Sequence, residues 1–455
     1  MDTPEHDQTP VPSVDRRTFL KVGGAAGLAA ATGGLEGILG AGRAPAYAQG
    51  ITLHMVRWND FVPASDTELK TKLLPEAEKI LGAKITLETI NANDIQARIT
   101  AAIQSKAGPD IIMTQHNRQH LYEGEAGPAD VTDVAEKIAK AQGGFYTQSR
   151  DVAVSGGKFI AVPWCIVGLM IAYRKSWLEE VGYSGGKFPE TWEQYREAGK
   201  KLKAKGRPIG QTMGHTFGDA PAFSYPYLWS WGGKEVEKDG KKVVLNSKET
   251  LESVKFMVGF WKDAHDEGGL AWDDTNNNRA FLSGTICSTL NGASIYIESL
   301  RKADQYKTEK GAQMKTDILH APLPKGPAGQ FAYHIIFSHM VMKYSKNQKA
   351  AKDLLLWLGT KENFERWFLT QKGFSVGSTR DWEKHPMWKE DPVMLPYRTA
   401  ALLGRAPGYA GPPNAKAAEV QTKYITTDMY AKAIQGMPPE EAVKWAHGEL
   451  LKIYG

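Results

Sequence analysis

The chain has 455 residues, of which 42% are hydrophobic and 24% are charged, and its formal net charge at pH 7 is +5. This composition is typical of globular proteins and excludes intrinsically disordered and collagen-like chains. The length allows two or three folding units. The cysteines are Cys165 and Cys287, too few for a disulfide framework or a four-thiolate metal site. The mild, scattered positive charge does not favour nucleic-acid binding.

The first 48 residues have the pattern of an export signal. Arg16 and Arg17 precede Thr-Phe-Leu-Lys, and a weakly apolar run rich in Gly and Ala follows from Val22 to Gly42. Ala46-Tyr47-Ala48 then supplies the small residues that a signal peptidase accommodates. The paired arginines resemble the twin-arginine motif of proteins that are exported already folded. We therefore expect residues 1–48 to be removed and the rest of the chain to reside in the periplasm.

From residue 51 the sequence alternates short apolar runs with helical periodicities. Strands are predicted at 53–56, 84–90 and 110–113, with helices between them at 66–81 and 94–105. The first helix should bend or break at Pro75, which lacks a backbone N–H. The β-α-β-α-β order implies parallel strands with helices packed over them. The predicted fold class is α/β.

A second set of elements begins after Gly156 and Gly157. Two strands are expected at 158–162 and 166–173, separated by Pro163 and Trp164. Further elements are predicted along the rest of the chain, at 176–181, at 251–261, 276–290, 335–342 and 350–358. Another helix is predicted to open at Pro189, with Thr191 or a nearby group as its cap. No internal repeat is present.

Three patterns do not support the chemistry that they first resemble. The segment from Gly182 to Gly186 spells the nucleophile elbow G-x-S-x-G, but a helix precedes it where the mechanism needs a strand. His116, His120 and Glu123 have helical spacing for a metal site but no evident further ligand, so no metal is expected. The two cysteines are interpreted as buried free thiols, because a chain folded in a reducing cytoplasm has little opportunity to pair them.

An aromatic-rich segment lies between residues 217 and 231. We interpret its second half, with Tyr227, Trp229 and Trp231, as core packing. Its first half contains Asp219 and Phe223 and is predicted to be a loop that faces a cleft. Aromatic faces beside hydrogen-bonding groups suit a polyhydroxylated ligand, whose C–H patches stack on rings while its hydroxyls need donors and acceptors. No carboxylate dyad, phosphate loop or dinucleotide fingerprint stands out.

A series of short motifs runs in a fixed order through nearly the whole chain after residue 50. They are Gly108-Pro109-Asp110-Ile111-Ile112 leading to His116-Asn117-Arg118, Gly157-Lys158-Phe159-Ile160-Ala161-Val162-Pro163 leading to Tyr173, Pro189-Glu190-Thr191-Trp192, Ala280-Phe281-Leu282-Ser283-Gly284, Asn291-Gly292 and Leu323-Pro324-Lys325-Gly326-Pro327. Their order and spacing resemble the family 1 extracellular solute-binding proteins, the group that contains the maltose-binding protein. Members of this family serve ATP-driven importers, mostly for sugars.

The resemblance implies two α/β lobes, joined by crossing strands, that close by hinge motion on a ligand between them. Lobe one would comprise residues 51–162 and 329–374, and lobe two residues 163–328 and 375–455. The chain would cross at Pro163 and at Gly326 to Gly329. The resemblance implies no enzyme activity and no cofactor. The implied partners are a small-molecule ligand and the membrane subunits of an ABC importer, and we expect a monomer.

Candidate ligand contacts follow from the same resemblance, at the carboxyl ends of strands and beyond the first crossing. They are Trp58, Asn59, Asp60, Gln115, His116, Asn117, Arg118, Trp164, Asp219, Phe223, Asn291, Ser294, Tyr296, Tyr409 and Asn414. Asp60 is expected to be a principal acceptor for ligand hydroxyls, and the alternative is that it caps the following turn.

The chain departs from the maltodextrin-binding members of the family. Thr114, Ser294 and Ala417 stand where those proteins stack sugar rings on tryptophans, and Val167 and Asn117 replace acids. These losses argue against a long glucan and favour a small sugar, a polyol or a related polar solute. Two alternatives stay open. One is a non-sugar polar or anionic solute, held by Arg118 and His116, and the other is a secreted glycoside-active enzyme, which needs paired carboxylates.

Overall fold

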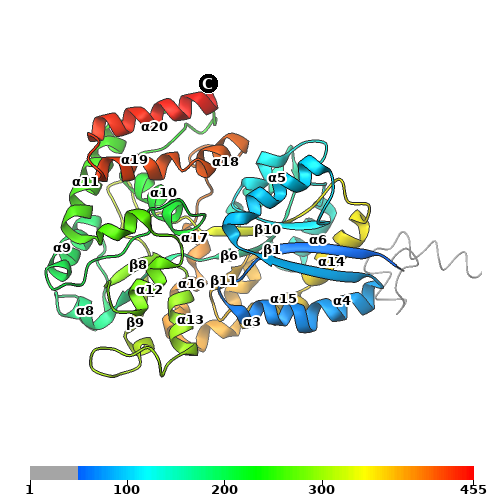
Figure 1. Cartoon of the computed structure of the whole chain (residues 1–455), viewed down its shortest axis with the longest axis horizontal. Coiled ribbons are helices and arrows are strands. Elements are labelled where there is room, and N and C mark those ends of the chain that lie inside the picture. The colour runs from blue at the N-terminus through cyan, green and yellow to red at the C-terminus, as the bar shows by residue number, and fades with distance from the viewer. Residues whose placement is uncertain (1–49) are drawn as a thin grey trace, which may run out of the picture.

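The computed structural model describes residues 50–455 and shows two lobes that lie side by side (Figure 1). Both lobes combine helices with a β-sheet, which confirms the predicted α/β class. The predicted export leader lies outside the described residues. Within residues 50–455, no helix is long and apolar enough to cross a membrane.

Lobe one is built on a six-stranded mixed sheet in the order β11-β6-β10-β3-β1-β2. Its strands are β1 (Thr52–Trp58), β2 (Lys84–Ile90), β3 (Ile111–Gln115), β6 (Val162–Val167), β10 (Ile335–Val341) and β11 (Ser375–Gly377). Strand β1 pairs in parallel with β2 and β3, as the β-α-β-α-β pattern predicts. The carboxyl ends of these three strands therefore meet at one edge of the sheet.

Helices pack around this sheet. They include α3 (Pro63–Glu68), α4 (Leu74–Leu81), α5 (Ile95–Ser105), α6 (Thr132–Ala141), α7 (Thr147–Ala153), α14 (Gln348–Leu358) and α15 (Lys361–Thr370). The helix predicted at 66–81 is interrupted by a π-helical turn, η2 (Leu69–Leu73), between α3 and α4. This turn ends two residues before Pro75, which cannot donate a helical hydrogen bond, and the chain stays helical across it, so the hydrogen-bond pattern changes here without a break in the helix.

Lobe two contains a smaller, antiparallel sheet in which β7 (Met170–Arg174) lies between β8 (Ser288–Asn291) and β9 (Ile318–Ala321). Its helices include α8 (Lys175–Glu179), α9 (Trp192–Lys203), α10 (Asp219–Trp231), α11 (Lys248–Ala264), α12 (Asn276–Leu282), α13 (Ser294–Arg301), α16 (Leu395–Arg398), α17 (Ala400–Leu403), α18 (Ala415–Thr422), α19 (Ile425–Ile434) and α20 (Pro439–Tyr454). Thr191 caps α9 through its side chain, as predicted.

The aromatic-rich segment differs from its prediction. Helix α10 begins at Asp219 and is buried along almost its whole length, so the loop that was expected through Phe223 ends at Gly218. The helix packs against α11 and α19, which cover it on more than one side. A helix enclosed in this way is apolar all round and gives no amphipathic pattern by which to recognise it.

The strand pairing also corrects the predicted course of the chain between the lobes. Pro163 and Trp164 lie inside β6, because a β-bulge opposite Phe337 and Ser338 accommodates a proline that has no N–H for the ladder. Residues 163–167 and 375–377 therefore belong to the sheet of lobe one. The first crossing lies between β6 and β7, at Gly168 and Leu169.

The second crossing follows the glycine-rich turn instead of coinciding with it. Gly326 and Gly329 bond to each other, and the N–H of Ala328 donates to the carbonyl of Ser230, at the end of α10. The turn thus lies within lobe two, and the chain returns to lobe one between this turn and β10. A third passage leads from β11 to α16. That the lobes move about these passages stays a prediction.

Gly168 at the first crossing should not tolerate a side chain. A Cβ there would lie 2.9 Å from Tyr397 Cδ1 and 3.2 Å from Ala400 Cβ. We expect Gly168→Ala to lower the free energy of unfolding by about 1–3 kcal/mol through overpacking. Gly448→Ala is the control, because nothing lies within 4 Å of its Cβ in α20, and it should stabilise the protein by about 0.5–1 kcal/mol. Urea unfolding measures both, and a Gly168→Ala variant as stable as the wild type would contradict the expected clash.

Candidate ligand-binding groove

A groove of about 120 Å³ lies between the two lobes and is lined by both. Its lining residues are Trp58, Asn59, Phe61, Asn91, Ala92 and Asn93 from lobe one and Phe217, Asp273, Asp274 and Thr275 from lobe two. The lobe-one residues lie at the end of β1 or follow β1 and β2, at the edge where the carboxyl ends of the parallel strands meet. Aromatic rings, amides and carboxylates therefore converge in one place.

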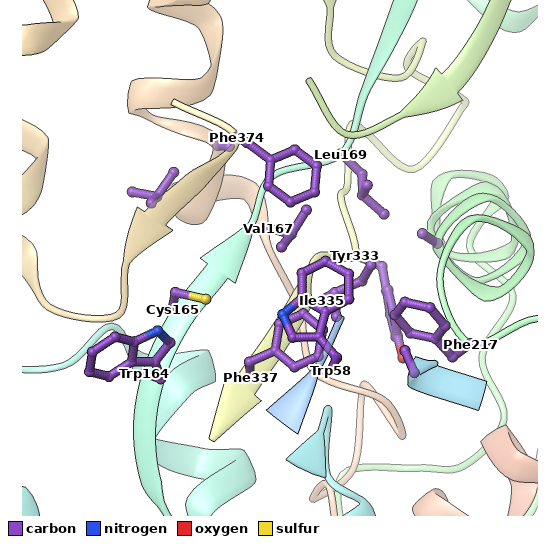
Figure 2. Packing of buried hydrophobic residues seen from close by; sticks show 14 of the residues in the cluster. Trp58, Trp164, Cys165, Val167, Leu169, Phe217, Tyr333, Ile335, Phe337 and Phe374 are labelled. Atoms are coloured by element: carbon purple, nitrogen blue, oxygen red, sulfur yellow. The ribbon is translucent and has the colours of Figure 1, made fainter. Parts of the chain in front are cut away.

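An aromatic cluster contributes Trp58, Phe61 and Phe217 to the lining of the groove, and Figure 2 shows Trp58 and Phe217 with Phe337 and Phe374. The Trp58 ring stacks on Phe337, with ring centroids 4.5 Å apart, and lies nearly parallel to Phe374 at 6.3 Å. Phe61 and Phe217 meet Trp58 edge-on, at 5.3 Å and 6.3 Å. Phe217 comes from lobe two and the other four rings from lobe one, so the cluster joins the lobes.

The backbone of Phe217 is also held by lobe one. Its N–H donates to Asn93 Oδ1 at 3.2 Å, and its carbonyl oxygen lies 3.0 Å from His116 Nε2. Because a carbonyl oxygen only accepts, Nε2 carries the proton and His116 Nδ1 is left as an acceptor. Nδ1 is buried and has no partner among the described residues. Phe217 of lobe two thus contacts lobe one through its ring, its backbone N–H and its carbonyl oxygen.

His116 itself is a constrained residue. Its φ of 54° lies in the left-handed region, which a residue with a side chain rarely adopts. Burial, with a smaller effect of the nearby Arg118, lowers the pKa of the imidazole to about 3. The ring is therefore neutral at pH 7, although its bond to the carbonyl of Phe217 opposes this shift of the pKa.

The neighbours of His116 make further contacts. Asn117 Nδ2 donates to the carbonyl of Asn414 at 3.3 Å, and Arg118 Nε donates to Gln421 Oε1 at 3.1 Å, both across the lobes. Gln115 stays within lobe one, where Nε2 donates to the carbonyl of Ala92 at 3.0 Å. Arg118 is buried and engaged with lobe two, and His116 is neutral. This arrangement does not favour an anionic solute held by these two residues.

Asp60 follows β1, but its carboxylate is engaged within lobe one. Oδ1 accepts from the N–H of Val62 at 2.8 Å, and Oδ2 accepts from Ser65 Oγ at 2.7 Å and from Gln371 Nε2 at 2.9 Å. Burial raises the pKa of the carboxyl to about 6, although the hydrogen bonds from Val62 and Ser65 oppose the shift. The geometry favours the capping role over contact with a ligand.

Asp219 and Asp274 place two buried carboxyl groups near the start of α10. Asp274 accepts from the N–H groups of Gly218 and Asp219, at 3.1 Å and 2.8 Å, and Asp219 Oδ2 accepts from Asn277 Nδ2 at 2.6 Å. Burial raises the pKa of both, that of Asp274 to about 6. Asp274 supplies acceptors for N–H groups at the start of the helix, which would otherwise lack them. This structural role explains the pair without a catalytic one.

Trp164 and Phe223 lie in the cores of the lobes. The Trp164 ring packs edge-on against Phe364 at 4.7 Å and Trp367 at 5.0 Å, and Figure 2 shows it apart from the Trp58 cluster. Phe223, on α10, packs against Trp192 at 5.8 Å inside lobe two. Trp164 is a candidate only if the chain crosses at Pro163, and Phe223 only if a loop extends through residue 223. The structure has a continuous strand and a helix at these places.

The remaining predicted contacts lie outside the groove, and most have partners of their own. They are Asn291, Ser294, Tyr296, Tyr409 and Asn414. Asn291 Nδ2 donates to Ser294 Oγ at 3.2 Å, and Tyr296 donates to Asp391 Oδ2 at 2.8 Å. Asn414 caps α18 through its side chain. Tyr409 lines a different cavity.

Sequence reasoning did not select most of the groove. The residues that it missed are Phe61, Asn91, Ala92, Asn93, Phe217, Asp273, Asp274 and Thr275. Asn91 and Asn93 directly follow β2, so the rule that selected residues after the first and third strands would also have selected them. The lobe-two residues reach the groove through packing between lobes, for which the local sequence has no signal.

The described residues contain no group of three or more His, Cys, Asp or Glu side chains that could hold a metal ion. His120 Nδ1 lies 2.9 Å from Glu123 Oε1 and forms a local pair with it. Cys165 and Cys287 are free and buried, as expected.

Comparisons with curated proteins give partial matches. The chain is 28% identical over 188 residues to the diacetylchitobiose binding protein DasA of Streptomyces coelicolor, covering 40% of this chain and 39% of that protein. It is 24% identical over 219 residues to a probable ABC transporter-binding protein of Deinococcus radiodurans, covering 46% of this chain and 50% of that protein. The aligned part thus spans half or less of these relatives.

Solved structures match over nearly the whole described chain. Maltose-bound MalE3 of T. maritima superposes with a TM-score of 0.72 at 20% identity, covering 89% of this chain and 100% of that one. A solute-binding protein of Thermotoga lettingae TMO bound to α-D-tagatose superposes with a TM-score of 0.74 at 17% identity. The match covers 89% of this chain and 100% of that one. A solute-binding protein of Agrobacterium radiobacter K84 in complex with ribitol superposes with a TM-score of 0.69 at 20% identity. The match covers 89% of this chain and 99% of that one. These matches show the same two-lobed fold.

The family follows from a match that covers more than half of the chain. Residues 64–363 match the family model of the bacterial extracellular solute-binding protein. This range contains the groove residues from Asn91 to Thr275 and strands of both lobes. The chain belongs to the bacterial extracellular solute-binding proteins.

Proposed function

We propose that this protein captures a small sugar or polyol in the groove beside Trp58 and delivers it to the membrane subunits of an ABC importer. The observation that carries the proposal is the convergence of rings and amides from both lobes in one groove. The C–H faces of a sugar stack on aromatic rings, while amides and carboxylates bind its hydroxyls. The sugars and the polyol bound by proteins of the same fold support this solute class.

The size of the groove favours a small solute. Its volume of about 120 Å³ is small beside that of ligand pockets, which is about 300–1,000 Å³. Trp58 and Phe217 contribute largely buried rings to the lining, and Asn59 and Asn93 contribute exposed amides. A long glucan would need an extended row of ring platforms, for which a groove of about 120 Å³ is too small.

Closure of the lobes on the solute is part of the proposal. The contacts of Phe217 with Asn93 and His116 join the lobes in this arrangement. A solute that touches both walls of the groove adds its contacts only when the lobes are together, so it favours closure. The twin-arginine leader and a monomeric state belong to the same proposal.

We propose that the protein does not alter its solute. Its family and its fold are those of binding proteins. The carboxyl pair of Asp219 and Asp274 is the feature that a glycoside-active enzyme would need, and hydrogen bonds to α10 and Asn277 explain it. Recovery of a chemically changed solute at catalytic rates would favour the enzyme.

A thermal-shift screen of sugars and polyols against the purified protein tests the solute class. A solute that binds only the folded state raises the unfolding midpoint by mass action. We expect at least one small sugar or polyol to do so. A midpoint that none of them raises would contradict the proposal.

Asn59 should contribute to affinity and not to stability. Its side chain is exposed in the groove and has no hydrogen-bond partner among the described residues. We expect Asn59→Ala to weaken binding of the solute found in the screen by about 0.5–1.5 kcal/mol per hydrogen bond lost. The matched control is Asn246→Ala, since Asn246 is also exposed but does not line the groove. Calorimetric titration compares the two, and equal affinities would remove Asn59 from the site.

Asp60 should show the opposite pattern. Substitution with Ala leaves Ser65 and Gln371 without their shared acceptor in a buried site. We expect Asp60→Ala to lower the free energy of unfolding by about 1–3 kcal/mol while the folded fraction keeps its affinity. Denaturant unfolding and calorimetric titration on the same variant distinguish the roles. Weakened affinity with unchanged stability would identify Asp60 as a ligand contact.

Acidification should separate the lobes through His116. In this arrangement the pKa of its imidazole is about 3, and in separated lobes water would restore it to about 6.5. The separated state then binds the proton more readily, so closure is favoured above pH 6.5 and loses stability as the pH falls. Lowering the pH from 7 to 5 should favour separation by about 2 kcal/mol.

The matched variant is His116→Gln, which keeps a donor for the carbonyl of Phe217 but does not titrate. Small-angle scattering at pH 7 and pH 5 compares the radius of gyration of the two proteins. The wild type should expand more than the variant. The same change in both would show that His116 does not couple closure to pH.

A further inference from the structure

A second cavity, of about 430 Å³, lies between the lobes. Its lobe-one wall is α7 with the preceding Tyr146, together with Arg380, and its lobe-two wall is the segment 401–413. Tyr146 is tied to lobe one by its N–H, which donates to the carbonyl of Ser378, and the N–H of Arg405 donates to the carbonyl of Ala332, in the passage between the glycine-rich turn and β10. Among the described residues, this cavity and the Trp58 groove share no lining residue.

Two arginines line the cavity without a carboxylate partner. Among the described residues, no carboxylate oxygen lies within 4.0 Å of the guanidinium nitrogens of Arg380 or Arg405. The Arg380 guanidinium lies over the Tyr146 ring at 5.4 Å, and that of Arg405 lies over the Tyr409 ring at 5.6 Å. Arg405 Nη1 donates to the carbonyl of Gly404 at 3.1 Å. Rings and a carbonyl thus orient the two cations and leave further N–H groups for an acceptor.

The carboxylates nearby have other partners. Asp151 also lines the cavity, and its nearest cation is Arg150, at 3.9 Å. Glu383, beside the cavity, accepts a hydrogen bond from the Tyr146 hydroxyl. The charged side chains that line the cavity are therefore two arginines and one aspartate, which leaves a net positive charge.

Gln148 adds a buried acceptor that needs a donor. Its side chain is 5% exposed, and its Nε2 donates to the carbonyl of Ala401 at 2.7 Å. Its Oε1 is buried and has no partner among the described residues. Leaving such an acceptor unpaired costs free energy, which a hydroxyl donor from a ligand would recover. Gly404 leaves the space that Gln148 needs, since a Cβ there would lie 2.1 Å from Oε1.

We propose that this cavity binds a small hydroxylated carboxylic acid, such as a sugar acid. Its carboxylate accepts hydrogen bonds from Arg380 and Arg405, and charge-assisted bonds of this kind are the stronger ones. A hydroxyl donates to Gln148 Oε1, and the Tyr146 and Tyr409 rings face its C–H groups. Because both lobes form the walls, the bound acid stabilises this arrangement of the lobes. The site is separate from the solute groove and does not depend on the function proposed for it.

Calorimetric titration with matched acids and neutral sugars tests the site. The probes are D-glucuronate and D-galacturonate at millimolar concentration, with D-glucose and D-galactose as their neutral counterparts. We expect saturable binding of at least one acid, weakened about tenfold or more in Arg405→Gln by the loss of a charge-assisted hydrogen bond. Arg380→Gln, at an exposed position, should weaken the same binding and serves if Arg405→Gln folds poorly.

Two controls separate this site from the groove. Arg301→Gln removes an exposed arginine that pairs with Glu298 elsewhere in lobe two, and it should leave acid binding unchanged. Asn59→Ala, in the groove, should also leave it unchanged. The proposal fails if neither acid binds saturably, or if both arginine variants bind the acids as tightly as the wild type. It also fails if Asn59→Ala, and not the arginine variants, abolishes acid binding, because the acid then lies in the groove.

Discussion

The attachment of Phe217 to lobe one is the constraint on which the rest of the site depends. Its ring closes the aromatic cluster around Trp58, its N–H is held by Asn93, and its carbonyl is held by His116. The segment that carries Phe217 leads directly into α10, the buried helix at the centre of lobe two. Movement of this one residue relative to Trp58 therefore requires movement of the whole lobe.

The groove residues owe their positions to this attachment. Asn59, Asn91 and Asn93 follow parallel strands of lobe one, and Asp273 to Thr275 precede α12 in lobe two. Asp274 fixes the lobe-two set relative to Phe217, because it accepts from the N–H groups of Gly218 and Asp219, which follow Phe217 in the chain. A solute in the groove thus contacts the same elements that hold the lobes together, so binding and closure are expected to be linked.

Much of the fold could be predicted from the sequence. The alternation of strands and helices from residue 53 to residue 113 predicts the parallel β2-β1-β3 unit, because buried parallel strands and amphipathic helices have different periods. The position of the crossing could not be predicted. A proline inside a strand reads as a strand end unless the strand forms a bulge against its partner, and the partner here, β10, lies more than 160 residues further along the chain.

The site was less predictable than the fold. Trp58 and Asn59 could be placed in the groove because they follow the first strand, which is a local feature. The role of Asp60 depends on Gln371, 311 residues away in sequence, and only the folded chain shows that its oxygens are occupied. Phe217 was noticed as part of an aromatic run, but its contacts with His116 and Asn93 span the lobes and leave no pattern in the sequence.

The two cavities between the lobes differ in chemistry. The groove beside Trp58 has amides and carboxylates, whereas the cavity beside Arg405 has two arginines without carboxylate partners among the described residues. A crystal structure of the protein with the solute found by thermal shift tests the central claim most directly. The account predicts the solute between Trp58 and Phe217, in contact with both lobes and with the His116 contact to Phe217 intact. A solute bound outside this groove, or bound to one lobe while the other stands apart, would contradict it.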